Sequence, residues 1–232
     1  KNIPAVDFYP SYITTYIERD VRAIKNIEDL NTFSRFLKLC AGRIGQPLNF
    51  ASLASDTDIS PNTAKSWLSI LEASYIIYTL PPHYANFNKR LIKSPKLYFY
   101  DTGVACSLLG LESKEQLMTH YLMGNLFENF IINELLKSKF NEGKKHNFYF
   151  WQDKSSKEVD LLVDKAGDLL PFEIKSGATL NKSYFRNLWY WQKLSGVADK
   201  NLSVIYGGEQ DFKAAYGQFI SWKNLESVIE SI

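Results

Sequence analysis

Residues 158–177 read EVDLLVDKAGDLLPFEIKSG, and this stretch decides the fold of the second half of the chain. Its two apolar runs, 159–163 and 169–174, are separated by a short polar segment with a glycine, which predicts two β-strands joined by a tight turn. Alternate residues of a strand share a face. Glu173 and Lys175 are therefore predicted to point together, while their neighbours point into the core.

Regular elements are predicted on both sides of this hairpin. Apolar residues recur at helical spacing over 122–140, and the segment 147–152 is predicted to be a further strand. After the hairpin, 182–194 is predicted to form a helix and 202–206 a strand. The aromatic residues of that helix are expected to cover the sheet, with stacking on bases as the alternative. The order helix, three strands, helix, strand predicts an α/β unit with a mixed central sheet.

Two carboxylates of the predicted sheet are expected to repel each other. Asp160 and Glu173 lie on adjacent strands, where like charges destabilise each other unless a cation or a proton intervenes. Carboxylate oxygens suit Mg²⁺ or Mn²⁺, so we predict a metal held by Asp160 and Glu173, with Glu128 of the preceding helix as a further ligand. Lys175 is the predicted catalytic residue that orients or deprotonates the attacking water, with Glu128 in support. The predicted reaction is metal-assisted hydrolysis of a phosphodiester.

The first half of the chain has the pattern of a helix-turn-helix followed by a hairpin. Ser60 before a proline is typical of a helix N-terminus and predicts a helix over 61–73. An earlier helix is predicted to begin near Asn31. Segments 75–80 and 96–100 are predicted to be two strands, which would form the hairpin of a winged helix.

Basic residues cluster in this region although the whole chain is nearly neutral. The excess of 27 basic over 25 acidic residues is too small to indicate a nucleic-acid partner by itself. The connection between the two predicted strands, however, carries several cations with interleaved aromatic residues and no acidic residue. Contact with nucleic acid and docking of a protein are both open for this surface. The predicted nucleic-acid-binding residues are Lys65, Lys89, Arg90, Lys93 and Lys96.

Length and composition bound the domain organisation. A chain of 232 residues, 45% hydrophobic and 22% charged, is a folded chain with room for one large or two small domains. We predict a lead-in helix over 1–30, a winged-helix-like domain over 31–110 and an α/β domain over 111–232. Because no glycine- or serine-rich linker separates them, the two domains are expected to pack closely.

Cysteine usage and hydropathy predict a cytoplasmic chain. Cys40 and Cys106 fit neither a disulfide framework nor a zinc motif. No apolar run is long enough to cross a membrane, and the start of the chain lacks the pattern of a signal peptide. The first residue is Lys1, within a predicted amphipathic segment, so we expect the chain to be part of a longer protein.

The sparse pattern of Glu128, Asp160, Glu173 and Lys175 resembles that of the PD-(D/E)XK nuclease superfamily. The resemblance implies an endonuclease-like fold for the second domain. The chain is therefore expected to be a mixed α/β (α+β) protein, with a winged-helix-like helical domain packed on a nuclease-like α/β domain with a mixed central sheet. One difference is that residues 158–160 read EVD, without the proline that gives the superfamily its name.

A second resemblance covers nearly the whole chain and rests on five separated blocks. The blocks resemble the C-terminal region of a family of bacterial and archaeal AAA-type ATPases, in which a P-loop ATPase domain precedes a winged helix and a nuclease-like domain. This chain contains no G-x-x-x-x-G-K-[ST] motif, so ATP is expected only in an upstream ATPase domain, which is also an expected protein partner. The blocks are YIERDVR (16–22), NTAKSWLSILEASYII (62–77), NKRLIKSPKLYFYDTG (88–103), GNLFENFIINEL (124–135) and EVDLL (158–162) with PFEIKSG (171–177).

Two functions of different classes follow from these predictions. The first is a DNA-interacting region with a Mg²⁺-dependent nuclease site, for which RNA is the alternative substrate and a membrane is not an expected partner. The second is a catalytically inactive module that docks protein or nucleic acid and regulates the ATPase. Charge contacts with phosphates would make binding strongly dependent on salt, so the two functions are open to experiment.

Overall fold

A polar residue caps the helix over 61–73 in the computed structural model. Ser60 Oγ accepts a hydrogen bond from the backbone N–H of Thr63, and Pro61 occupies the first helical position of α4 (Pro61–Ala73). A proline is tolerated there because the first backbone N–H groups of a helix have no partner inside the helix. The predicted helix over 61–73 is therefore confirmed at both ends.

The helix predicted to begin near Asn31 is also present. Asp29 caps α2 (Leu30–Ala41) by accepting a hydrogen bond from the N–H of Thr32, so this prediction is confirmed, with Asp29 and not Asn31 as the cap of the helix. Aspartate and asparagine are both good caps, and the sequence pattern alone does not separate two candidates so close together. The first-half helices are α1 (Ala5–Tyr12), the π-helical turn η1 (Ile13–Val21), α2, α3 (Phe50–Thr57), α4, α5 (Thr102–Leu108) and α6 (Lys114–Thr119).

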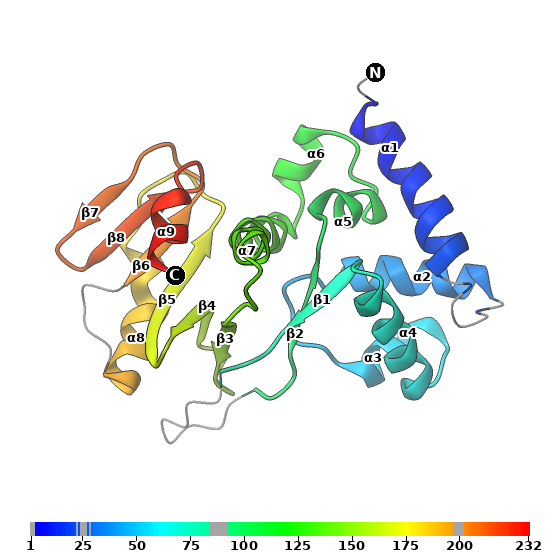
Figure 1. Ribbon diagram of the computed structural model, residues 1–232, viewed down its shortest axis with the longest axis horizontal. Coiled ribbons are helices and arrows are strands. Elements are labelled where there is room, and N and C mark those ends of the chain that lie inside the picture. The colour runs from blue at the N-terminus through cyan, green and yellow to red at the C-terminus, as the bar shows by residue number, and fades with distance from the viewer. Residues whose placement is uncertain (1–2, 22, 24–26, 28, 84–91, 197–201) are drawn as a thin grey trace. The chain divides into compact units, whose positions relative to one another are not determined.

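Residue contacts divide the chain into two units (Figure 1). The structure describes residues 3–21, 23, 27, 29–83, 92–196 and 202–232. The first unit comprises Lys1–Thr79 and Pro95–Asn129, and the second comprises Leu80–Ser94 and Phe130–Ile232. The predicted domain boundaries near residues 30 and 110 rest on sequence patterns and stay predictions.

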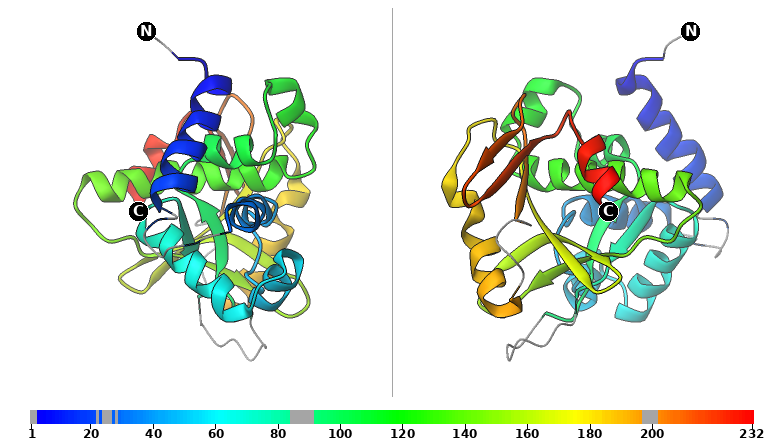
Figure 2. Two further views of the ribbon diagram at one scale, coloured as in Figure 1. Left: turned by 90° about the vertical axis from the view of Figure 1, so that its right-hand side faces the viewer. Right: turned by 60° about the vertical axis from the view of Figure 1, so that its left-hand side comes forward.

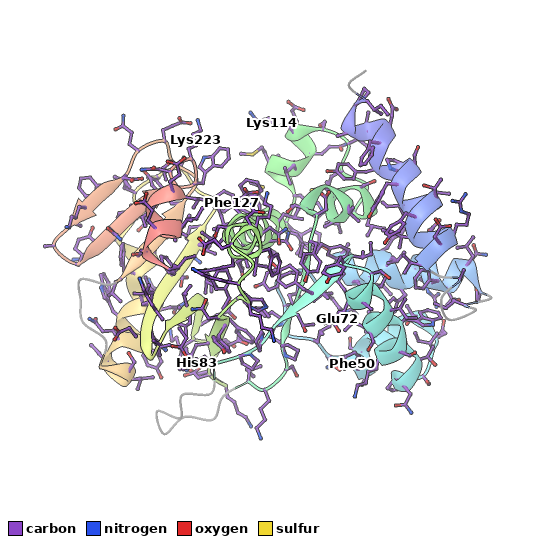
Figure 3. The ribbon with its side chains drawn as sticks, viewed as in Figure 1. Phe50, Glu72, His83, Lys114, Phe127 and Lys223 are labelled. Carbon is purple, nitrogen blue, oxygen red and sulfur yellow. The ribbon has the colours of Figure 1, made fainter. Side chains whose placement is uncertain are left out.

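Aromatic packing holds the helices of the first unit together. Phe33 and Phe36 of α2 meet the ring of Trp67 of α4 edge-on, with ring centroids 5.3 and 5.4 Å apart. Strands β1 (Ile77–Leu80) and β2 (Lys96–Phe99) form a two-stranded sheet, which confirms both predicted strands. Glu72, labelled in Figure 3, accepts a hydrogen bond from Thr79 Oγ1 at 2.8 Å, so α4 is tied to the beginning of the sheet.

The second unit is built on a six-stranded sheet, and the prediction that this sheet is mixed is confirmed. Its strand order is β3-β4-β5-β6-β8-β7. Strands β3, β4 and β5 run antiparallel, β6 and β8 continue parallel to β5, and β7 returns antiparallel to β8. The bounds are β3 (Phe148–Gln152), β4 (Glu158–Lys165), β5 (Asp168–Lys175), β6 (Ser203–Tyr206), β7 (Phe212–Ala214) and β8 (Gly217–Ser221).

Helices lie on both sides of this sheet (Figure 2). On one side, the 3₁₀ turn η2 (Lys182–Phe185) leads into α8 (Arg186–Ser195), whose Leu188 and Trp191 are completely buried in the core. This confirms that the aromatic helix covers the sheet. On the other side lies the short helix α9 (Glu226–Ser231). The long helix α7 (Met123–Asn141) confirms the helix predicted over 122–140.

Among the described residues, no helix has both the length and the apolar character needed to cross a bilayer.

Candidate functional site

Three of the four predicted site residues meet where β4 and β5 pair. The antiparallel register joins Leu161 to Phe172, and one step further along it lie Asp160 and Glu173. The backbone N–H of Ile174 donates a hydrogen bond to Asp160 Oδ2 at 2.7 Å, which fixes the carboxylate of β4 against β5. The alternation predicted for the hairpin thus places Asp160 and Glu173 side by side.

Lys175 connects the two carboxylates. Its Nζ lies 2.7 Å from Glu173 Oε1 and 3.4 Å from Asp160 Oδ2. The lysine side chain is 34% exposed, whereas the side chains of Glu173 and Asp160 are only 3% and 8% exposed. One ammonium therefore faces two nearly buried carboxylates and also reaches solvent. If both carboxylates are ionised, the three groups carry a net charge of −1.

Glu173 is a nearly buried carboxylate with one oxygen atom unsatisfied within the described part of the chain. Its Oε2 atom is buried and has no hydrogen-bond partner among the described residues. Burial raises the pKa of this carboxyl group well above its usual value, the neighbouring Asp160 and Glu158 raise it further, and Lys175 opposes both effects. A buried carboxylate oxygen without a donor costs free energy unless a proton or a cation satisfies it.

The residues present fit a hard divalent cation. Asp160 and Glu173 offer oxygen ligands, which Mg²⁺ and Mn²⁺ prefer. The unpartnered Oε2 of Glu173 is the atom that a cation would satisfy, and binding would replace the proton that the raised pKa retains. Glu158, the first residue of β4, is half-buried and brings a third carboxylate close enough to affect the pKa of Glu173.

A small cavity of about 240 Å³ adjoins these groups. It lies within the second unit, and η2 and the beginning of α8 form its other wall. From the sequence, Lys182 and Gln192 were expected to line the site from this segment, but the four residues of this wall were not named. The signal that could have found them is that η2 follows directly after the loop that leaves Lys175. The lining residues are Glu173, Lys175, Ser183, Tyr184, Arg186 and Asn187.

The fourth predicted residue, Glu128, lies in the first unit, on α7. Its Oε1 accepts a hydrogen bond from Lys96 Nζ at 2.9 Å and another from Tyr98 OH at 2.5 Å. Glu128 is 7% exposed and Lys96 is 1% exposed. Of the four predicted site residues, Asp160, Glu173 and Lys175 therefore lie together in the second unit. A role of Glu128 in metal binding stays a prediction.

The predicted nucleic-acid-binding set needs one correction. Lys96 was expected to be a surface cation, but its ammonium is buried against Glu128, so it cannot contact a phosphate at the surface. A strand residue with apolar neighbours points either outward or inward, and the sequence did not reveal which. Lys65 on α4 and Lys93 are exposed, and their role stays a prediction. Lys89 and Arg90 lie outside the described residues.

The raised pKa of Glu173 gives a stability prediction for the metal-free protein. The folded state holds a proton that the unfolded state releases, so the free energy of unfolding should fall as the pH rises above the ordinary range of a glutamate, by at most about 1.4 kcal/mol per pH unit. Urea unfolding between pH 5 and pH 8 in a chelator measures this slope. Glu173→Gln should flatten it, whereas Asp168→Asn, a change of an exposed carboxylate at the start of β5, should leave it unchanged. An equally steep slope in Glu173→Gln would contradict the assignment.

Both halves of the chain match models of known sequence families. Residues 2–115 match a domain of unknown function, DUF8612. Residues 123–225 match a second domain of unknown function, DUF4143, which is found at the C-terminus of AAA-ATPase-like proteins. This match agrees with the resemblance to the C-terminal region of AAA-type ATPases. The winged helix and the nuclease superfamily stay predictions.

Two mycobacterial proteins are similar over most of the chain. Uncharacterised proteins of Mycobacterium bovis and Mycobacterium tuberculosis are each 30% identical to it over 201 residues, which is 87% of this chain. The chain spans 44% of the length of these relatives. It thus consists of a DUF8612 match followed by a match to the ATPase-associated domain DUF4143, with the trio of Asp160, Glu173 and Lys175 inside the second.

Proposed function

We propose that the second unit is a divalent-metal-dependent phosphodiesterase that cleaves nucleic acid, with DNA as the substrate and RNA as the alternative, in the C-terminal region of an AAA-type ATPase. One observation carries the proposal: the buried, unpartnered Oε2 of Glu173 lies in a site where Asp160 and Lys175 converge. Purely structural ion pairs satisfy their buried oxygens, whereas a metal site leaves oxygens available to the ion.

Each residue of the trio has a distinct task in this proposal. Asp160 and Glu173 would hold Mg²⁺ or Mn²⁺, and the bound metal would supply Lewis-acid stabilisation of the charge that develops on the phosphate. The N–H of Ile174 keeps Asp160 oriented. The partly exposed ammonium of Lys175 would orient the attacking water and donate hydrogen bonds to the phosphodiester oxygens in the transition state. Water attack forms a new P–O bond while the P–O bond to the departing sugar oxygen breaks. The attacking water loses a proton to solvent, and the sugar oxygen takes up one from solvent.

The remaining parts of the proposal concern the protein as a whole. ATP would bind only in an ATPase domain outside this chain, and that domain would be a partner of the chain. The length of the relatives leaves room for such a domain, because the chain spans 44% of them. We propose that the helices α2 to α4 and the sheet β1–β2 act as a winged helix that docks on nucleic acid, with the exposed Lys65 as one contact.

A cleavage assay on the 232-residue chain tests the proposed activity. Linear, circular, single-stranded and branched DNA and an RNA are incubated with Mg²⁺, with Mn²⁺ or with chelator. We expect metal-dependent cleavage by the parent and by the exposed-carboxylate control Asp168→Asn, and background cleavage only by Asp160→Asn. Because asparagine has nearly the shape of aspartate and its amide oxygen can still accept the hydrogen bond from Ile174, the variant is expected to fold, which circular dichroism checks. Equal cleavage by Asp160→Asn and the parent would show that a contaminating nuclease causes the signal.

The hydrogen bonds that Glu128 already accepts inside the first unit favour a second candidate function. The Glu128 carboxylate is already held by Lys96 and Tyr98, so the first unit can be stable without a metal at this position. A catalytically inactive module that docks protein or nucleic acid and regulates the ATPase is consistent with this. Under this alternative, no metal would stimulate cleavage by the parent, and Asp160→Asn would not change its affinity for Mn²⁺ measured by calorimetry.

A further inference from the structure

The cavity beside Glu173 and Lys175 has a second wall made of polar side chains. Ser183 and Tyr184 of η2 and Arg186 and Asn187 of α8 line it. Among the described residues, none of these four side chains forms a hydrogen bond or an ion pair. Arg186 is exposed and Asn187 is half-buried, so the guanidinium and the amide stand at the cavity available to a ligand.

The opposite wall supplies an independent sign of a ligand. Glu173 lines the same cavity, is 2% exposed, and its Oε2 has no partner. A cavity with an unsatisfied buried carboxylate oxygen on one side and uncommitted donors on the other is suited to a cation and an anion bound together. Either ion alone would leave one wall unsatisfied.

The size and the donor types of the cavity select the anion. About 240 Å³ is less than the roughly 300–1,000 Å³ of sites for drug-sized molecules, so the cavity suits a compact group. A guanidinium binds phosphate oxygens in pairs and stays charged at every physiological pH. The neighbouring amide of Asn187 can donate to a further oxygen. A phosphate group fits these donors.

The local structure holds this wall in place. Asn181 Oδ1 accepts a hydrogen bond from the N–H of Ser183 and begins η2, and Phe185 between the lining residues is completely buried. A side-chain carbon added to Gly177 would lie 2.7 Å from the hydroxyl oxygen of Tyr184, so η2 lies directly against the loop that leaves Lys175. Arg186 is therefore carried by a rigid element and not by a mobile loop.

We propose that Arg186, assisted by Asn187, binds the backbone phosphate of a polynucleotide in this cavity, next to Lys175. The proposal rests on the proposed function and extends it, since it names the residues that hold the substrate phosphate. Arg186 adds a positive charge beside Asp160, Glu173 and Lys175, which favours a phosphate at this side of the cavity. The same chemistry would bind an internal phosphate of the polynucleotide or a phosphate at its end.

Binding measured without cleavage tests this proposal. Fluorescence anisotropy of the 232-residue chain is recorded in Ca²⁺ in place of Mg²⁺, with labelled single-stranded and duplex DNA that carry or lack a 5′-phosphate. We expect Arg186→Gln to weaken binding about tenfold or more and to reduce the slope of log affinity against log salt by about 0.7–0.9. Arg186→Lys should retain the slope and recover only part of the affinity. Lys213→Gln, which removes an exposed charge on β7, is the matched control and should bind like the parent.

The outcomes separate this proposal from the proposed function. If the parent binds in an Arg186-dependent manner but never cleaves, the phosphate site stands and the proposed activity fails. If the parent cleaves and Arg186→Gln binds and cleaves equally well, the phosphate site alone is overturned. Absence of any binding by the parent overturns it as well. If binding requires the 5′-phosphate, the ligand is the end of the DNA strand. If DNA without the 5′-phosphate also binds, the ligand is an internal phosphate of the DNA.

Discussion

Replacing Lys175 with methionine should lower the rate of metal-dependent cleavage by about 10²- to 10⁴-fold, the range that a positioned proton-transfer or charge-stabilising group contributes. Lys175 Nζ faces Glu173 at 2.7 Å and Asp160 at 3.4 Å, and its side chain is partly exposed. Methionine fills a similar volume but offers no charge and no donor. The loss should therefore lie in the chemical step and not in folding.

Single-turnover cleavage with the enzyme in excess measures this effect, because it separates chemistry from product release. Lys213→Met is the matched control, since it removes an exposed lysine of the same sheet and should cleave like the parent. Mn²⁺ affinity, measured by calorimetry, should be no weaker in Lys175→Met, because a cation that competes for the two carboxylates has been removed. A variant that retains parental cleavage rates would rule out a role of Lys175 in the reaction.

The hairpin around residues 158–177 could be predicted because its signals are local. Strand periodicity and one tight turn specify β4 and β5, and the two-residue period then places Glu173 and Lys175 on one face. Antiparallel pairing of neighbouring strands brings Asp160 beside them. Three members of the site therefore follow from the sequence pattern alone.

Other features depend on contacts between distant segments and gave no such signal. Strand β7 (Phe212–Ala214) is short and its first two residues are exposed, and β8 begins at Gly217, whose φ is 142°. Strand β7 has only three residues, and the apolar residues of β8, Phe219 and Ile220, are adjacent and do not alternate, so the edge of the sheet was not predicted. The cavity wall with Arg186 was not predicted for a related reason: Arg186 comes beside Glu173 only when α8 packs against the sheet.

Lys96 shows most clearly that a charged residue in a basic segment of the sequence need not lie at the surface. The segment around it contains several cations, which predicts a basic surface, yet its side chain is 1% exposed and its ammonium contacts Glu128. The partner follows 32 residues later in the chain, on α7. A hydrophobic pattern cannot reveal a buried ion pair of this separation, because both members are scored as polar.

Replacing Lys96 with methionine should consequently destabilise the first unit by about 3–5 kcal/mol, since removal of one partner leaves the other charge buried without its counter-ion. Glu128 is 7% exposed and would keep the hydrogen bond from Tyr98 but lose the ammonium that faces Oε1. Urea unfolding followed by circular dichroism measures the loss, and Lys93→Met, a change of an exposed neighbour, should stay within about 0.5 kcal/mol of the parent.

The double variant Lys96→Met with Glu128→Gln separates charge from packing. Once both charges are gone, the cost of a lone buried carboxylate disappears, and an amide in its place can still accept a hydrogen bond from Tyr98. We therefore expect the double variant to recover a large part of the stability that Lys96→Met loses, a coupling of the kind that mutant cycles measure. If the double variant were as unstable as the sum of the two single variants, Lys96 would act through its packed aliphatic chain and not through its charge. The cleavage rate of Glu128→Gln then reports separately whether this carboxylate also supports the metal.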